Sequence, residues 1–400
     1  MNPPTPTINI GIAGLGAAGR AFLPAIAAHA GFKLVAVADP LATARDEVSR
    51  THDAAAYSSV AALLAHPKLD AVYIATPTDV HEQHVLAAFA AGKHVLVEKP
   101  MAATLDGAKA MVLAGERAER TLLVGHSHSF DAPIKAMHEL IEGGSLGRVQ
   151  MVNTWCFTDW LYRPRRADEL DNNLGGGVTF RQGAHQFDII RLLCGGMARR
   201  VRARTFDWDP ARRATGAHIA YIDFVDGAAA TAVYNGYGRF SSMDLGFNIS
   251  EWGFLQPPEN RPPLRRAANA SAEAEQRAKQ QRPAMPASAR YQPFFGLTLV
   301  SCERGEIRQS PEGLLVATAE GQSEIKLPTD RSPRDIVMAE FYDAITGHGA
   351  AIHDGRWGLA NLEVCAAVLL SSHTGREIVL QEQVAVNGPL SQSSPQTPRQ

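Results

Sequence analysis

The stretch Ile8-Asn-Ile-Gly-Ile-Ala-Gly-Leu-Gly-Ala-Ala-Gly19 decides the fold. It begins as a short apolar run rich in isoleucine and continues into the glycine pattern G-x-G-x-x-G. A second apolar run, Lys33–Ala38, ends in Asp39. A strand that enters such a turn, followed by a helix and an acidic residue about 20 positions on, is the context in which the pattern binds a dinucleotide. The sequence therefore predicts a nucleotide-binding βαβ unit.

The glycines of the pattern have separate predicted roles. Gly14 allows the tight turn, Gly16 lets the backbone approach the pyrophosphate, and Gly19 lets helix and strand pack closely. The start of the next helix, at Ala17 and Ala18, offers unpaired N–H groups and a partial positive charge to the phosphates. A glycine turn that binds no ligand is the alternative.

Asp39 bears on the choice between NAD and NADP. Its carboxylate can accept hydrogen bonds from the adenosine ribose and would repel a 2′-phosphate, which favours NAD. Arg45 lies close enough in sequence to keep NADP open.

Residues 8–130 alternate apolar runs with stretches of helical length, which predicts βαβ units and a parallel sheet. Longer alternating runs follow, and they predict a mostly antiparallel sheet. We expect an α/β chain with a dinucleotide-binding domain over 1–130 and an α+β domain over 131–385. Pro257–Pro293 is expected to be a flexible insertion with a helical middle at Ala267–Gln281, and residues 386–400 a disordered tail. The strands expected in the second half are Arg148–Phe157, Arg199–Trp208, His218–Val225, Ala228–Asn235 and Phe247–Ser250.

Glu98-Lys99-Pro100 follows the fourth expected strand of the first half. Ligands of open α/β sheets bind beyond the carboxyl ends of the strands, so Lys99 is expected to face the nicotinamide. An amine there can polarise a substrate oxygen or stabilise the alkoxide that forms as hydride leaves. A surface lysine paired with Glu98 is the simpler interpretation of this residue alone.

Several motifs together resemble the Gfo/Idh/MocA oxidoreductase family over residues 8–382. They are Gly14–Gly19, Asp39, Ala75-Thr76-Pro77, Glu98-Lys99-Pro100, Gly175-Gly-Gly177 with His185 and Asp188, and Asp354–Gly375. The resemblance implies an N-terminal Rossmann domain, a C-terminal domain with a large open sheet, and an active site between them. It also implies that Thr76, Pro77, Glu98 and Lys99 border the cofactor. Lys99 would take part in catalysis, with a Lys99–Pro100 bond that is often cis.

His185 matches the catalytic histidine of that family, and a buried structural histidine is the alternative. Asp188 lies three residues later and could orient His185 or bind substrate. The family often has an aspartate where this chain has Arg181, so the roles of that aspartate in sugar dehydrogenases cannot be carried over. Many relatives have an arginine pair where this chain has His126 and His128, which makes both histidines candidate substrate contacts or structural residues.

Arginines cluster between Arg148 and Arg213, where there are 12 arginines, no lysine and 7 acidic residues. Arginine forks bind carboxylates in a bidentate manner. We therefore expect an anionic substrate, a carboxylate or dicarboxylate, bound by Arg181 and the loop that contains Arg163, Arg165 and Arg166. A solvated basic loop or an oligomer contact is the alternative.

Within the family, residues 125–131, 157–166 and 175–180 most resemble the branch that oxidises the cis-4,5-dihydrodiol of phthalate. The resemblance implies that one carbinol gives a hydride to NAD(P)+, that Lys99 and His185 share the proton transfer, and that the product becomes 4,5-dihydroxyphthalate. One alternative is a dehydrogenase of a sugar, inositol or sugar acid. Another is a dinucleotide-binding sensor without chemistry, although the presence of both Lys99 and His185 counts against it.

Composition argues against other classes of protein. The 39 basic and 41 acidic residues lack the basic excess of a nucleic-acid binder. The four cysteines form no C-x-x-C pair, so we expect neither disulfides nor a metal site. No apolar run reaches about 18 residues and no signal peptide is recognisable, so no membrane contact and a cytoplasmic location are expected. Because relatives commonly pair their open sheets, the resemblance implies a homodimer or homotetramer.

Overall fold

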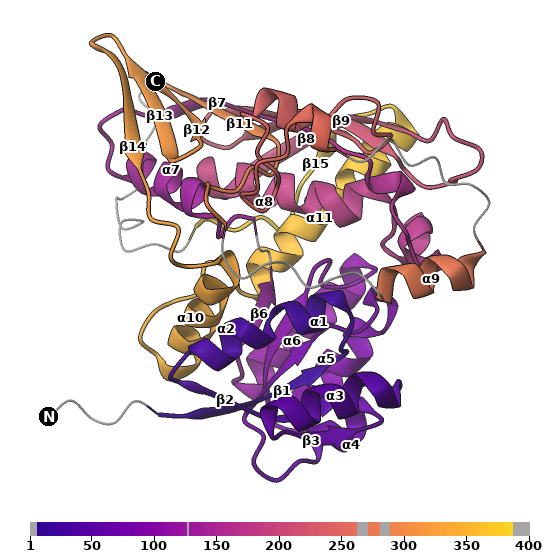
Figure 1. Cartoon of the computed structure of the whole chain (residues 1–400). Helices are drawn as coiled ribbons and strands as arrows, with labels where there is room; N and C mark the ends of the chain where they lie inside the picture. Colours follow the sequence, from indigo (N-terminus) through magenta and orange to yellow (C-terminus); the bar gives the residue numbers. More distant parts are fainter. Residues whose placement is uncertain (1–5, 126–127, 262–270, 281–288, 387–400) are drawn as a thin grey trace, which may run out of the picture.

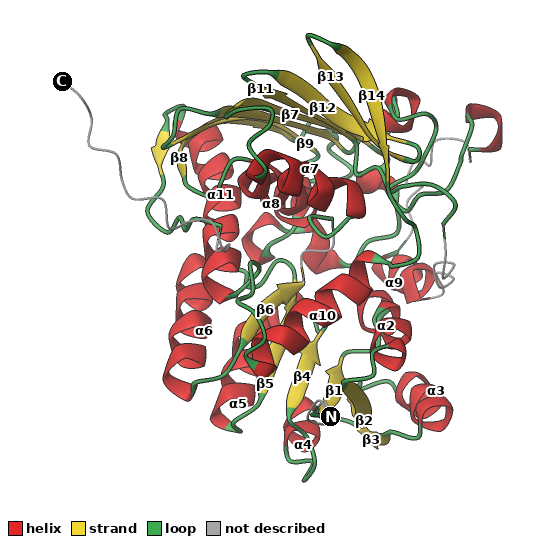
Figure 2. Cartoon of the chain, turned by 90° about the vertical axis from the view of Figure 1, so that its left-hand side faces the viewer, coloured by secondary structure: helices red, strands yellow, loops and turns green. Residues whose placement is uncertain are grey.

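The computed structural model describes residues 6–125, 128–261, 271–280 and 289–386. These residues build two sheets, one of six strands and one of nine, and helices pack on both. Figure 1 shows the six-stranded sheet in the lower half of the molecule and the nine-stranded sheet across the top. Helices α8 (Ala184–Leu193) and α11 (Gly355–Thr374) lie between the sheets, as Figures 1 and 2 both show. The predicted α/β fold class is confirmed.

The first sheet has the strand order β3-β2-β1-β4-β5-β6, and every neighbouring pair is parallel. In this dinucleotide-binding order, ligands bind where the order reverses, between β1 and β4. The strands are β1 (Ile8–Ala13), β2 (Phe32–Ala38), β3 (Ala55–Tyr57), β4 (Ala71–Ile74), β5 (His94–Glu98) and β6 (Leu122–Gly125). The helices are α1 (Ala17–Ala21), α2 (Leu23–Ala28), α3 (Ala42–His52), α4 (Val60–Leu64), α5 (His81–Ala90) and α6 (Leu105–Ala118).

All four residues of β4 are buried because helices cover both faces of this sheet. Two details differ from the sequence predictions. The helix expected after the glycine turn breaks into α1 and α2 at Phe22, since Pro24 has no N–H to donate to the carbonyl one turn back. The sequence does not predict β3 and α4, because segments of three and five residues carry too little periodic pattern.

The second sheet has the order β14-β13-β12-β11-β7-β10-β9-β8-β15, antiparallel except for the pair of β10 with β7. Its strands are β7 (Val149–Phe157), β8 (Ala198–Phe206), β9 (Ala217–Phe224), β10 (Ala229–Asn235), β11 (Leu297–Cys302), β12 (Gly305–Ser310), β13 (Gly313–Thr318), β14 (Gly321–Lys326) and β15 (Ile378–Val379). Helix α7 (Ala132–Glu142) precedes them, and short turns of 3₁₀ type lie at Thr78–Val80, Trp160–Tyr162, Ala167–Leu170, Asn172–Leu174, Ser242–Leu245 and Pro258–Asn260. A π-helical turn, Thr179–Gly183, leads directly into α8. Within the described ranges, no helix combines the length and apolarity needed to cross a membrane.

The two faces of the second sheet have different surroundings. In β9, Ala220 and Ile222 are fully buried, whereas Ile219 and Tyr221 are about half exposed. The buried face packs on α8 and α11 in one hydrophobic core. The predicted mostly antiparallel open sheet is therefore confirmed, and one of its faces is open to solvent.

Phe247–Ser250 is not a strand, and this prediction was wrong. Phe247 and Asn248 have φ values of 58° and 59°, which no strand allows, and a single bridge joins Ile249 to Leu255. None of the strands β11 to β15 was predicted, and β14 is exposed along its whole length and has no apolar alternation that could have marked it. Of the helix expected at Ala267–Gln281, the described residues form α9 (Ala272–Gln280). The rest of the predicted flexible insertion is described only in part, and residues 387–400 of the predicted tail lie outside the described residues.

Helix α10 (Pro333–Thr346) packs on the first sheet although it follows the strands of the second (Figure 2). The rings of Phe341 and Phe32 stack with centroids 6.0 Å apart. The hydroxyl of Tyr342 donates a hydrogen bond to the carbonyl of Pro6. The chain therefore returns to the nucleotide-binding sheet late in the sequence, and the division at residue 130 stays a prediction.

Candidate functional site

The glycine turn after β1 has the geometry that the fingerprint requires. Gly14 has a φ of 93°, and a Cβ there would lie 2.6 Å from the carbonyl oxygen of Ala75. A Cβ on Gly19 would lie 1.9 Å from the carbonyl oxygen of Gly14, so close packing of helix on turn requires glycine. A Cβ on Gly16 would meet no atom within 4 Å, so the space beside that residue is open to a ligand.

The first turn of α1 offers hydrogen-bond donors to that space. Gly16 is the N-cap residue and provides no side chain to cap the helix. The N–H groups of the first helical residues, Ala17 and Ala18 among them, have no acceptor within the helix. A dinucleotide pyrophosphate supplies such acceptors, so the turn fits the predicted cofactor.

Asp39 lies across the turn and is hydrogen-bonded to the backbone on both sides. Its Oδ2 accepts from the N–H of Leu15 and its Oδ1 from the N–H of Leu41, both at 2.8 Å. Each carboxylate oxygen keeps a further lone pair for a ribose hydroxyl. Nη1 of Arg45 donates to the carbonyls of Asp39 and Pro40 at 3.1 and 3.0 Å, so this guanidinium is held beside the same loop.

The loop after β4 carries Thr76 and Pro77 and is held by two histidines. Nε2 of His81 lies 2.8 Å from the carbonyl oxygen of Thr76, and its Nδ1 lies 3.1 Å from the carbonyl oxygen of Pro100. Burial lowers the pKa of His81 to about 4, so the ring is neutral near neutral pH and its single N–H donates to one of these two carbonyls, which follow β4 and β5. Nδ1 of His84 lies 3.0 Å from Oγ1 of Thr76. The sequence analysis missed both histidines, because no motif or apolar period marks them.

Lys99 lies directly after β5, and its bond to Pro100 is cis, as the family resemblance implied. The amine donates a 2.8 Å hydrogen bond to the carbonyl of Arg181 in the π-helical turn. Such turns are frequent at functional sites. Burial lowers the pKa of Lys99 to about 8, with Glu98 opposing this effect and Arg181 and Arg165 adding to it. The amine is therefore easier to deprotonate than an ordinary lysine.

Glu98 interacts with a different side chain. Its Oε1 accepts a 2.5 Å hydrogen bond from the hydroxyl of Tyr73, and its Oε2 accepts from the backbone N–H of Lys99 at 3.2 Å. Burial and the adjacent Glu98 carboxylate raise the pKa of Tyr73. The amine of Lys99 is directed to the second domain, which does not fit the simpler interpretation of a surface pair with Glu98.

His185 and His128 lie together although they are far apart in the sequence. Their rings make a T-shaped contact with centroids 4.6 Å apart, and both rings contact Phe295. Nδ1 of His128 lies 3.0 Å from Oδ2 of Asp131, and both histidines are almost fully buried. The other histidine predicted here, His126, lies outside the described residues.

Asp188 is fully buried on α8 and links that helix to α11. Its Oδ1 accepts a 2.6 Å hydrogen bond from Nε1 of Trp357, and its Oδ2 lies 3.8 Å from Nε2 of His353. Although burial lowers the pKa of His353, the carboxylates of Glu340 and Asp188 raise it above the ordinary value. Direct contact with substrate, one of the two roles predicted for Asp188, does not fit this burial.

The arginine loop is packed into the protein. Arg163 pairs with Asp159 at 2.6 Å and with Glu251 at 3.4 Å. Arg165 pairs with Glu169 at 3.6 Å and is only 6% exposed. Glu169 lies within the predicted loop, but the sequence offers no sign that it is a buried partner. The alternative of a solvated basic loop does not fit this arrangement.

Arg166 and Arg181 share one carboxylate, that of Asp168. Nη2 of each lies near Oδ2 of this residue, at 2.7 Å for Arg166 and 3.2 Å for Arg181. Arg181 is 9% exposed, and its buried Nε has no hydrogen-bond partner among the described residues. The structure therefore brings Arg181 to Lys99 and to the arginine loop at once.

Two further residues near the histidines directly follow the segment Phe247–Ser250 that was expected to be a strand. Nε1 of Trp252 donates to Oε1 of Glu251 at 3.1 Å, and the Trp252 ring lies 5.2 Å from the ring of His128. Opposed by burial, the guanidinium of Arg163 and the ring of His128 hold the pKa of Glu251 below its usual value. The sequence signal that could have identified Glu251 and Trp252 is an acidic residue next to a tryptophan, outside any regular hydrophobic pattern.

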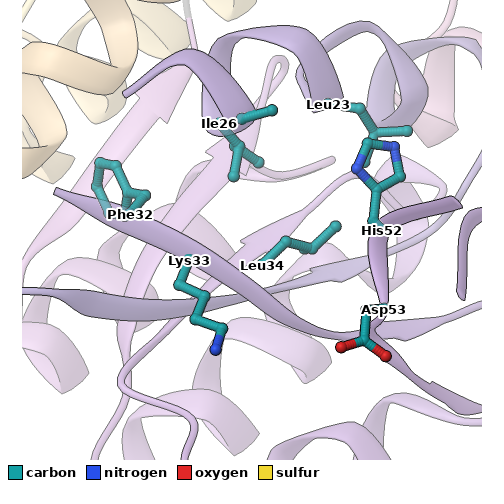
Figure 3. A pocket seen from close by; sticks show the side chains of 8 residues that line it. Leu23, Ile26, Phe32, Lys33, Leu34, His52 and Asp53 are labelled. Carbon is teal, nitrogen blue, oxygen red and sulfur yellow. The ribbon is translucent and has the colours of Figure 1, made fainter. Parts of the chain in front are cut away.

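A pocket of about 190 Å³ lies elsewhere, at the amino end of β2 (Figure 3). Its lining residues are Leu23, Ile26, Ala27, Phe32, Lys33, Leu34, His52 and Asp53. None of the predicted site residues is among them. Since ligands of this fold bind at the carboxyl ends of the strands, the pocket is at the opposite edge of the sheet.

Comparison with known proteins is consistent with this geometry. Residues 8–126 match the GFO/IDH/MocA family, described as an oxidoreductase family with an NAD-binding Rossmann fold, and residues 134–249 match the GFO/IDH/MocA C-terminal domain. The 1-carboxy-3-chloro-3,4-dihydroxycyclohexa-1,5-diene dehydrogenase of Comamonas testosteroni is 39% identical over 90% of this chain and 94% of its own length. A crystal structure described as a dehydrogenase from Bordetella bronchiseptica RB50 has a TM-score of 0.87 and 38% identity, covering 94% of this chain and 100% of the other.

A more distant structure has the same fold. An oxidoreductase from Agrobacterium radiobacter, solved with NAD+, L-tartaric acid and magnesium, has a TM-score of 0.71 at 20% identity, covering 93% of this chain and 98% of the other. The two matched segments and the long alignment at 39% identity decide the assignment. The chain belongs to the GFO/IDH/MocA oxidoreductase family and is an NAD-dependent dehydrogenase.

Proposed function

We propose that this dehydrogenase oxidises a cis-dihydrodiol of a carboxylated ring, and specifically the cis-4,5-dihydrodiol of phthalate. The observation that carries the proposal is the contact of Lys99 with Arg181. This contact joins an amine of lowered pKa to the backbone of a residue whose guanidinium is buried and whose Nε–H has no acceptor in the described part of the chain. A hydroxyl that must lose a proton and a carboxylate that needs a cation would both find a partner here.

The charge around Arg181 supports an anionic substrate. Ion pairs and hydrogen bonds join five cations, Arg165, Arg166, Arg181, Arg212 and Lys279, to three carboxylates, Asp168, Glu169 and Glu275. Asp79 is a further carboxylate that acts on Arg166 and Arg181, so these described residues together have an excess of one positive charge. Buried charge is costly without a counter-charge, so a dicarboxylate complements the cluster better than a neutral sugar does.

The relative from Comamonas testosteroni supports the same substrate class. Its name describes a cyclohexadiene that carries a carboxyl group and hydroxyls on adjacent carbons. Phthalate cis-4,5-dihydrodiol has the same arrangement with two carboxyl groups. Oxidation of this diol is favourable, because the ketone formed at one carbinol tautomerises to an aromatic catechol.

The residues of the site have separate roles in the proposed reaction. The glycine turn and Asp39 would hold NAD+, which supplies the hydride acceptor when bound. Lys99 or His185 accepts the proton of the reacting hydroxyl, and the lowered pKa of Lys99 makes its neutral form available near neutral pH. Arg181, together with the arginine loop, holds the carboxylates and so orients the ring.

A substrate panel tests the proposed function. The reduction of NAD+ is followed at the NADH absorbance with phthalate cis-4,5-dihydrodiol, benzene cis-dihydrodiol, myo-inositol, glucose and a sugar acid. We expect the highest kcat/KM for the dicarboxylated diol. Faster oxidation of inositol, glucose or the sugar acid would overturn the proposal and favour the sugar-dehydrogenase alternative.

We also propose that NAD+ is preferred over NADP+, because the carboxylate of Asp39 faces the glycine turn. Asp39→Ser should lower the ratio of kcat/KM for NAD+ to that for NADP+ by about tenfold or more, equivalent to a repulsion of about 1.4 kcal/mol. Asp106→Ser, an exposed change in the first turn of α6, is the matched control. A wild-type enzyme that prefers NADP+ would contradict this interpretation of Asp39.

We further propose that the open face of the second sheet joins two copies of the chain. Met151, Trp155, Ile219 and Tyr221 are about half exposed on this face, and Ile219 and Trp155 both pair with Val233 in the sheet register. Contiguous apolar surface of this kind marks interfaces. Light scattering should give a multiple of 43.0 kDa for the wild type and a lower mass for Ile219→Lys. Val225→Lys, in the turn after β9, is the control, and a wild-type mass of one chain would contradict the proposal.

A further inference from the structure

Helix α9 lies over the arginine loop at the level where the two sheets face each other (Figure 1). Two of its four charged residues, Glu275 and Lys279, are spaced four apart and therefore lie on one face of the helix. Glu275 is 8% exposed and Lys279 is partly buried, whereas Arg277 is exposed on another face. The inward face of α9 thus carries one negative and one positive charge into the site.

Glu275 fastens the helix to the loop. Its Oε1 lies 2.6 Å from Nη2 of Arg212, and its Oε2 accepts from the backbone N–H of Arg165 at 2.9 Å and from Nη1 of Arg212 at 3.0 Å. All three residues are buried. A buried carboxylate with this many donors holds the backbone of Arg165 in one place.

Lys279 provides the counter-charge for Glu169. Its amine pairs with Oε2 of Glu169, which also accepts from the backbone N–H of Arg166. Burial alone would raise the pKa of Glu169, but Lys279, Arg165 and Arg181 offset this effect and hold that pKa well below its usual value. If Lys279 were removed, only the arginines that border the site would remain to balance this carboxylate.

Those arginines also reach the reacting region. Arg181 receives the hydrogen bond of Lys99 through its carbonyl, and both Arg181 and Arg165 affect the charge of that amine. A shift of the Arg181 guanidinium towards Glu169 would withdraw that guanidinium from a substrate carboxylate.

We propose that α9 is a positioning element for carboxylate recognition, in which Lys279 neutralises Glu169 so that Arg181 stays available to the substrate. Lys279 acts through Arg181 and need not touch the substrate. The inference rests on the proposed function for the identity of the substrate, but the pairing that it assigns to Lys279 can be tested without turnover.

The kinetic test compares Lys279→Met with Lys279→Arg and with Arg277→Met on the exposed face of α9. For the dicarboxylated diol, Lys279→Met should raise KM by about tenfold or more while kcat changes by less than about threefold, as for the loss of a binding interaction. KM for benzene cis-dihydrodiol should not change, and Lys279→Arg should restore KM. An unchanged KM in Lys279→Met, or an equal rise in Arg277→Met, would overturn the proposal.

Hydrogen exchange separates this proposal from the proposed function. In the NADH-bound protein, Lys279→Met should increase amide exchange in residues 160–170, and Arg277→Met should leave it as in the wild type. If no diol is oxidised but exchange rises in this way, the proposed function fails and the positioning role of α9 stands. Unchanged exchange in Lys279→Met would overturn the positioning role.

Discussion

Replacing Lys99 with methionine is expected to reduce kcat/KM for diol oxidation by about 10² to 10⁴-fold, the usual contribution of a general acid or base. Methionine has a similar length and no amine, so the hydrogen bond to the carbonyl of Arg181 and the proton acceptor are both lost. The Kd for NADH, measured by fluorescence, should stay within about threefold, because the pyrophosphate turn is untouched. Near-normal turnover would exclude a catalytic role for Lys99.

The pH dependence of the wild-type enzyme gives a second test of the same residue. With a pKa of about 8, the amine of Lys99 is protonated below that pH and neutral above it. A neutral amine accepts the proton, so kcat/KM for oxidation should rise about tenfold per pH unit below 8 and level off above it. Lys109→Met, an exposed change on α6, should keep this profile. A rising limb that persists in Lys99→Met would assign proton transfer to His185 instead.

The nucleotide-binding half could be predicted from the sequence because its determinants are local. The positions of Gly14 and Gly19 are dictated by atoms of the same turn, and the residues Ile8–Asp39 contain the strand, turn, helix and acidic residue together. Buried strands such as β4 can also be recognised in the sequence as short apolar runs. The break at Phe22 and the short β3 are the details that such patterns do not resolve.

The site in the second half depends on contacts between distant segments, which a single sequence does not reveal. Arg163, Arg165 and Arg166 were recognisable as a cluster, but their carboxylate partners come from as far away as Glu251 and Glu275. Counting charges within one window therefore overestimated the free positive charge of the loop. His81 was missed for the same reason, since its two carbonyl partners lie on the ends of different strands.

Replacing Arg181 with methionine is the second change with a large expected effect. A hydrogen bond to a charged group contributes about 1.5–3 kcal/mol, so loss of this guanidinium should raise KM for the dicarboxylated diol by about 10 to 150-fold. The backbone carbonyl that holds Lys99 is kept in this variant, and kcat should therefore fall much less than KM rises. Steady-state kinetics at saturating NAD+ measure both quantities.

Two comparisons isolate the guanidinium from a general loss of structure. Arg181→Lys retains the charge but not the planar fork, so it should recover only part of the affinity for the dicarboxylate. Benzene cis-dihydrodiol has no carboxylate, and its KM should be the same in the wild type, Arg181→Met and Arg181→Lys. In both variants Arg166 still pairs with Asp168, so the change does not leave this carboxylate without an ion-pair partner. An equal rise in KM for the carboxylated and uncarboxylated diols would show that Arg181 supports the fold of the site rather than the recognition of a carboxylate.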